Sequence, residues 1–236
     1  MAARARSRES GQVDEREVTT LHPMTESLAT AIDRATYIRR YKYRIIQALQ
    51  AIRESDIERM IDLLATARDE RRQVFLCGNG GSASTASHMS VDLGKGASVG
   101  RERRFRVVSL SDNTAWITAL ANDMDYSEIF VEQLKGLAEA GDVLVAFSGS
   151  GNSPNVIKAV EWANARGMRT IGLTGRPGGL LGQRAEFPVF IESSHMGHIE
   201  EGHFVLQHLV SYYFAEAEGF TSLDCAERML PQTSVG

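Results

Sequence analysis

Five short apolar runs, most of them separated by helical patterns, limit the folds open to this chain of 236 residues. The runs occupy residues 74–77, 106–110, 143–147, 170–173 and 188–191. Nearly continuous apolar strands that alternate with helices are typical of a parallel sheet covered on both faces. Right-handed crossovers then leave few topologies. The sequence therefore predicts an α/β fold with a five-stranded parallel sheet, in which ligands bind beyond the carboxyl ends of the strands.

An apolar stripe at helical spacing precedes the first run. It consists of Ile38, Tyr41, Ile45, Ala48 and Ile52. The stripe either packs on its own domain or joins a helical bundle between subunits, and the pattern favours neither. Ser55 and Glu58 form a capping-box signature that predicts the start of a second helix. A last helix is expected from about residue 199 to 217.

One domain accounts for this order of elements. We expect a flexible arm over residues 1–27, a domain with an N-terminal helical pair over 28–218, and a polar tail over 219–236. The formal net charge of −4 argues against generic nucleic-acid binding. Cys77 and Cys225 lie far apart, so neither a disulfide scaffold nor a cysteine zinc site is expected, and Cys77 should be buried and unreactive.

The compartment is predicted from features that the sequence lacks. It has no apolar run of about 18 residues, so no membrane span is expected. The arginines near the N-terminus are not followed by the apolar segment of a secretory signal. We therefore expect a cytoplasmic protein with no membrane partner.

A glycine-rich loop, Gly78-Asn79-Gly80-Gly81-Ser82, follows the first run and leads into a helix. Glycine lets backbone amides approach a ligand closely, and the N-terminus of a helix favours anions. An ordinary strand-to-helix turn uses the same residue types. This loop alone is therefore weak evidence for a phosphate site.

A second loop of the same kind follows the third run and holds Ser148, Ser150 and Ser153 with two glycines. Pro154 suits the first turn of the helix that follows. Ser153 also suits a simple helix cap. The loop has neither the lysine nor the spacing of a nucleotide P-loop. Two such loops on one sheet favour a phosphate-binding site.

Two groups of residues have the chemistry of metal ligands. His88 and Asp92 are four residues apart and share a helical face, a spacing that serves either a metal site or a surface hydrogen bond. Near the C-terminus, three histidines and two glutamates fall within eleven residues, from His198 to His208. Imidazole and carboxylate suit zinc and other divalent metals. A solvated helix face explains the second group equally well.

Five motifs match one protein family in the same order. They read GNGGSASTASHMSVDLGKG, ALANDMDYSEIF, SGSGNSPNVIKA, LTGRPGG and HIEEGHFVLQH. The chain therefore resembles the phosphoheptose isomerases of the sugar isomerase (SIS) superfamily, from about residue 30 to 217. The resemblance implies a three-layer SIS fold whose N-terminal helices serve oligomerisation, and a homotetramer with shared active sites. It also implies conversion of sedoheptulose 7-phosphate to an aldose heptose 7-phosphate.

The resemblance also implies three sets of site residues. Phosphate is expected at Ser82, Ser148, Ser150 and Ser153. The sugar is expected at Asn79, Gly80, Gly81 and Asn113. One zinc or other divalent ion per subunit is expected at His88, Asp92, Glu200 and His208, with Glu201 as the alternative to Glu200.

Three departures from the family bear on the chemistry. Asp92 stands where the family usually has the longer Glu, Glu200 stands where Gln is common, and Gly197-His198 replaces an Asp-Arg pair. Aldose–ketose isomerisation moves protons between adjacent carbons and between their oxygens. The hypothesis is that Asp92 acts as the base and His208 as the acid, with the metal ordering these groups or the sugar oxygens.

Two other functions stay open at this point. One is a non-enzymatic SIS adaptor of the replication-initiator-binding type, against which the retention of His208 argues. The other is an isomerase for a different sugar phosphate. Both readings keep the same fold and the same phosphate loops.

Overall fold

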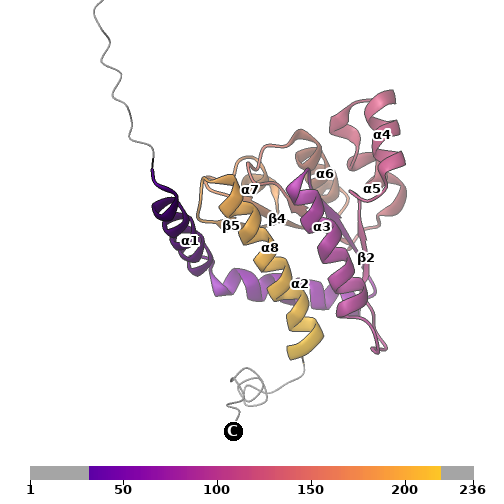
Figure 1. Ribbon diagram of the computed structural model, residues 1–236. Helices are drawn as coiled ribbons and strands as arrows, with labels where there is room; N and C mark the ends of the chain where they lie inside the picture. The colour runs from indigo at the N-terminus through magenta and orange to yellow at the C-terminus, as the bar shows by residue number, and fades with distance from the viewer. Residues whose placement is uncertain (1–31, 219–236) are drawn as a thin grey trace, which may run out of the picture.

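The structure is a computed structural model that describes residues 32–218. The arm predicted over 1–27 and the tail predicted over 219–236 lie outside the described residues. A parallel sheet of five strands carries helices on both faces (Figure 1), as predicted. The strands are β1 (Gln73–Cys77), β2 (Arg106–Ser109), β3 (Val143–Phe147), β4 (Arg169–Gly175) and β5 (Phe187–Ile191).

The order of the strands is β2-β1-β3-β4-β5, and all neighbouring pairs are parallel. The chain first extends the sheet from β1 to β2 and then returns to the other side of β1, where Val74 pairs with Val143 of β3. This reversal leaves a crevice at the carboxyl ends of β1 and β3. The two glycine-rich loops follow those two strands.

Alternating side chains of the strands form two hydrophobic layers. Val74 and Leu76 belong to the first layer, whereas Phe75 and Cys77 belong to the second layer, on the other face of the sheet. Cys77 is fully buried, and burial raises the pKa of its thiol to about 12. This agrees with the prediction of an unreactive cysteine.

The helices complete the layers on either side of the sheet. The first layer holds α1 (Arg34–Gln50), α2 (Glu54–Asp69), α3 (Gly81–Val91), the π-helix η1 (Asp92–Gly96), α8 (Met196–Tyr212) and the π-helix η3 (Tyr213–Ala217). The second holds α5 (Val131–Leu137), α6 (Pro154–Ala165) and α7 (Leu181–Arg184). Helix α4 (Thr114–Asp123) and the 3₁₀-helix η2 (Tyr126–Glu128) follow β2.

Helix α1 projects from the side of the domain and contacts α8 (Figure 1). Asp33 caps its N-terminus by accepting a hydrogen bond from the Thr36 amide at 3.0 Å. Of the predicted stripe, Ala48 is buried, but Ile38 is 56% exposed. Tyr37, Tyr43 and Ile46 are also exposed. The helix thus packs on its own domain and still presents apolar surface.

Two predicted helix boundaries are wrong. Helix α2 begins at Glu54, not after a Ser55 cap, and the position before it, Arg53, makes no side-chain capping bond. Arg53 pairs instead with Asp56 at 2.9 Å, and acidic residues in the first turn favour the helix N-terminus. Helix α8 begins at Met196, earlier than predicted, and its predicted last turn is the π-helix η3.

No helix within residues 32–218 is both long enough and apolar enough to cross a bilayer.

Candidate functional site

The loops after β1 and β3 enclose a cavity of about 210 Å³ at the crevice of the sheet. Its walls come from these loops and from the first turns of α8. The lining residues are Asn79, Ser82, Phe147, Ser148, Gly149, Ser150, Ser153, Met196 and Glu200. The N-termini of α3 and α6 start at the two loops, so their backbone dipoles favour an anion here.

Two glycines are needed for the shape of these loops. Gly80 precedes α3 with φ +54°, and Gly151 has φ +67°. A Cβ on Gly151 would lie 2.0 Å from the carbonyl oxygen of Gly178. Only glycine combines this backbone conformation with such a close approach.

A pair of amides joins the two loops. The Asn79 amide donates to Asn155 Oδ1 at 2.9 Å, and the Asn155 amide donates to Asn79 Oδ1 at 2.8 Å. The Tyr126 hydroxyl also donates to Asn79 Oδ1, at 3.0 Å. Asn155 is 1% exposed. The sequence did not single it out, because an Asn in a first helical turn is typical of local capping.

The serines of the second loop face one another. Ser148 and Ser153 hydroxyls are 3.0 Å apart, and Ser150 Oγ accepts from the Asn152 amide at 3.2 Å. Ser153 occupies the N-cap position of α6, but its side chain makes no capping bond. Its hydroxyl is therefore available to a ligand, which the simple cap reading did not anticipate.

Asn113 has a structural role that the sequence did not predict. It caps α4, and its Oδ1 accepts from the Trp116 amide at 3.0 Å. It does not line the cavity of about 210 Å³. The sugar contact expected of Asn113 stays a prediction.

Two histidines and an aspartate converge where α3 packs against α8. His88 Nε2 lies 3.0 Å from His208 Nε2, and Asp92 Oδ2 lies 3.3 Å from His88 Nε2 and 3.6 Å from His208 Nε2. Tetrahedral zinc with bonds near 2.1 Å separates its ligand atoms by about 3.3 Å. The three side chains, here called the His–Asp–His trio, therefore have the spacing of zinc ligands.

The surroundings of Asp92 also suit a cation. Asp92 begins the π-helical turn η1, a feature often found at functional sites. Its Oδ2 is buried and has no hydrogen-bond partner among the described residues. The Phe204 ring lies 4.9 Å from the His88 ring and 4.6 Å from the His208 ring, centre to centre. Phe204 therefore holds both imidazoles, a role that the sequence did not suggest.

Glu200 and Glu201 lie apart from the trio. A Cβ on Gly81 would be 2.8 Å from Glu200 Oε1, so the Glu200 carboxylate rests on the first residue of α3. Glu201 accepts a hydrogen bond from the Tyr41 hydroxyl at 3.0 Å and thereby ties α8 to α1. Neither carboxylate belongs to the group whose ligand atoms lie within 4.8 Å of one another.

The C-terminal motif HIEEGHFVLQH, residues 198–208, does not form a solvated helix face throughout. His198 and His203 are 3% and 1% exposed. Burial is the main cause that lowers the pKa of each imidazole, to about 4 for His203. The solvated reading is wrong for these two residues. The His198 ring lies 4.5 Å from the Tyr41 ring of α1, and the His203 ring lies 6.0 Å from the Phe147 ring of β3, centre to centre.

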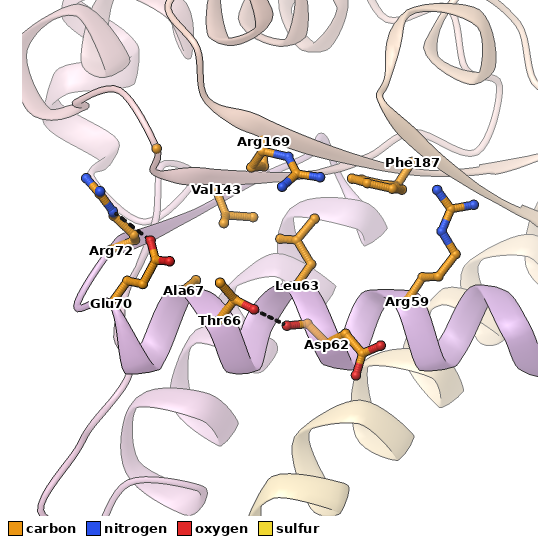
Figure 2. A pocket seen from close by; sticks show the side chains of 11 residues that line it. Arg59, Asp62, Leu63, Thr66, Ala67, Glu70, Arg72, Val143, Arg169 and Phe187 are labelled. Atoms are coloured by element: carbon orange, nitrogen blue, oxygen red, sulfur yellow. Dashed lines mark hydrogen bonds and ion pairs between the residues drawn. The ribbon is translucent and has the colours of Figure 1, made fainter.

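Another hollow, of about 400 Å³, lies at the opposite edge of the sheet beside α2 (Figure 2). Three arginines border it, and two of them are paired with carboxylates: Arg72 with Glu70 at 3.5 Å and Arg169 with Glu186 at 2.7 Å. No residue of the glycine-rich loops or the trio lines it. The glycine-rich loops and the cavity that they line are therefore separate from this hollow.

Sequence comparisons identify related proteins. The family model described as "SIS domain" matches residues 36–175. The phosphoheptose isomerase of Geobacter sulfurreducens is 37% identical over 183 residues, which cover 76% of this chain and 94% of the relative. That of Thermodesulfovibrio yellowstonii is 37% identical over 158 residues, covering 65% and 76%.

Solved structures of similar fold include two phosphoheptose isomerases. GmhA from Neisseria gonorrhoeae has a TM-score of 0.69 and 30% identity, and the match covers 77% of this chain and 96% of that one. The enzyme from Francisella tularensis has a TM-score of 0.71 and 26% identity, with coverage of 78% and 98%.

The burial of His203 predicts a pH-dependent stability. Its folded pKa of about 4 lies below the ordinary 6.5, so the unfolded chain binds the proton more readily between these values. The free energy of unfolding should therefore fall by about 3 kcal/mol as the pH drops from above 6.5 to 4. In urea unfolding with chelator present, the free energy of unfolding of His203→Gln should vary less with pH than that of the wild type.

The matched control for this measurement is His195→Gln, which replaces an exposed imidazole at the N-cap position of the same helix. Its free energy of unfolding should change with pH as steeply as that of the wild type. Parallel profiles for His203→Gln and the wild type would contradict the role given to burial.

Proposed function

The chain belongs to the SIS domain family, among the phosphoheptose isomerases, and on that premise we propose that it interconverts sedoheptulose 7-phosphate and D-glycero-D-manno-heptose 7-phosphate. One observation carries the proposal. The helix that begins at the phosphate loop with Ser82 also bears His88 and Asp92. Anion binding and proton-transfer groups thus share one rigid element.

The spacing along α3 supports a phosphorylated open-chain sugar. His88 is six positions after Ser82, which is about 9 Å along a helix axis. With the phosphate at Ser82, Ser148, Ser150 and Ser153, an extended sugar chain reaches the trio with its carbonyl end. The phosphate then supplies binding energy that orients the distant reacting carbons.

The proposed chemistry uses Asp92 as base and His208 as acid. The Asp92 carboxylate takes a proton from C1 of the ketose while the Nδ1–H of His208, whose Nε2 faces the trio, donates to O2, which gives an enediol. Asp92 then returns its proton to C2, and His208 takes the proton of O1, which forms the aldehyde. No atom is gained or lost. Since Asp92 Oδ2 faces the histidines, Oδ1 is the oxygen assigned to the base.

The trio fits a divalent metal by its spacing, its donor types and the orphaned Asp92 Oδ2. We propose that His88, Asp92 and His208 hold one zinc or similar ion, and that Glu200 is the fourth ligand only if its side chain turns away from Gly81. When bound, such an ion would stabilise negative charge on the sugar oxygens. We also expect the enzyme to work in the cytoplasm.

Replacing Asp92 by Asn tests the base. The change keeps size but removes the proton acceptor, so turnover should fall by about two to four orders of magnitude. Binding of the sugar phosphate should change much less, because the serines still hold the phosphate. Ser150→Ala is the matched comparison and should weaken binding while leaving metal content intact. Kinetic assays and calorimetric titration separate the two effects.

The assay should use a panel of ketose phosphates. Full activity in Asp92→Asn would eliminate Asp92 as the base. Turnover of another ketose phosphate in preference to the heptose would replace the substrate but keep the chemistry. Wild-type protein that binds metal yet isomerises none of the panel would favour the adaptor.

Metal content tests the trio directly. Protein purified without chelator should contain about one zinc or other divalent ion per chain. The His88→Ala/His208→Ala double variant should lose it, whereas Glu201→Gln should not, because Glu201 is bonded to Tyr41. Elemental analysis gives the ratio, and unchanged metal in the double variant would refute the site.

We propose a homotetramer in which α1 contributes to the contacts. The support is the apolar surface that Tyr37, Ile38, Tyr43 and Ile46 leave exposed on this helix. Light scattering at micromolar concentration should give four times the chain mass. Ile38→Lys with Ile46→Lys should lower it, and removal of residues 1–27 should not. A monomeric wild type would contradict the proposal.

A further inference from the structure

Three neutral polar side chains form a buried line on the inner side of α8. His203, Gln207 and Ser211 follow one another at steps of four residues, so they share one helical face. They are 1%, 0% and 1% exposed. Helix α8 packs against β4, β5, α2 and α3, which places this line inside the domain.

Five polar atoms in this line have no close, well-aligned hydrogen-bond partner among the described residues. They are His203 Nδ1, His203 Nε2, Gln207 Nε2, Gln207 Oε1 and Ser211 Oγ. Buried polar groups in folded proteins are almost always paired, with protein or with ordered water. Five unpaired atoms along two turns of one helix would be a large, concentrated penalty.

The chemistry of the three side chains selects the partner. None of them is a carboxylate, an ammonium or a guanidinium, and the low pKa of His203 keeps its imidazole neutral near pH 7. A neutral imidazole, an amide and a hydroxyl each offer both a donor and an acceptor. An ion would find no opposite charge here, whereas a water molecule both donates and accepts.

We propose that His203, Gln207 and Ser211 bind a short file of internal water molecules between α8 and the sheet. The line covers about 12 Å of helix. A buried water typically makes about three hydrogen bonds, so several waters are needed to pair all five atoms.

The file begins under the phosphate loops. The His203 ring lies 6.0 Å from the Phe147 ring, centre to centre, and Phe147 is the residue before Ser148. The backbone of Thr174, near the end of β4, offers the His203 ring a weak hydrogen bond. Directional hydrogen bonds through water fix the rotation of α8 about its axis more strictly than apolar contacts alone. That rotation sets the direction in which the His208 side chain points. This inference about hydration does not depend on the proposed reaction.

A crystal structure of the full chain at high resolution tests the file directly. It should show ordered waters within about 2.7–3.2 Å of the three side chains. A dry line, in which these side chains bond to one another or to the backbone, would overturn the proposal.

Thermal melting tests for the waters independently. Gln207→Met keeps the side-chain length but removes a donor and an acceptor. If waters fill the line, the variant leaves them with fewer hydrogen-bond partners. Its melting midpoint should then fall about 3 °C or more below that of the control Leu206→Met, which brings Met into an adjacent buried apolar position. If the line is dry, Met removes two unpaired atoms, and a midpoint at or above that of the control overturns the proposal.

Discussion

The pairing of β1 with β3 is the contact on which the site depends. Parallel strands present their carboxyl ends at one edge, and the reversal of strand order puts the loops of these two strands next to each other. The reciprocal amides of Asn79 and Asn155 then fix the distance between the loops. Neither loop could form an anion site of this size alone, because each contributes only part of the lining.

Helix α8 starts at that edge and carries His208 about 18 Å along its axis, where it packs against α3. It can approach the sheet closely because Gly202 faces Ile191 of β5, where a Cβ would lie 2.8 Å from the Ile191 side chain. Gly81, the first residue of α3, likewise leaves room for the Glu200 carboxylate of α8. The pairing of α3 with α8 therefore sets the position of His208 relative to His88, and a small rotation of α8 would disperse the trio.

The sequence predicted the strands well because continuous apolar runs have few alternatives in a chain with this alternation. It also predicted the contact between His88 and Asp92, which depends only on local helical spacing. At the start of α2 it failed on a local detail, because Arg53 pairs with Asp56 and no Ser55 cap forms. Elsewhere it failed where a distant partner decides: the burial of His203 depends on the side of α8 that meets the sheet, and Glu200 is held by its contact with Gly81. Such contacts leave no periodic trace in the sequence.

The proposed phosphate site has no full positive charge in its lining. The cavity between the loops is lined by neither lysine nor arginine, and its lining includes the Glu200 carboxylate. If phosphate binds here as proposed, the attraction comes from serine hydroxyls and from the N-termini of α3 and α6, whose influence decays within one turn. Short-range donors of this kind are sensitive to position, so binding would depend more on loop geometry than on ionic strength. Under the same proposal, Glu200 would oppose a second negative charge at the rim of the cavity, which would restrict the phosphate to the serine side and leave the α8 side for hydroxyl groups.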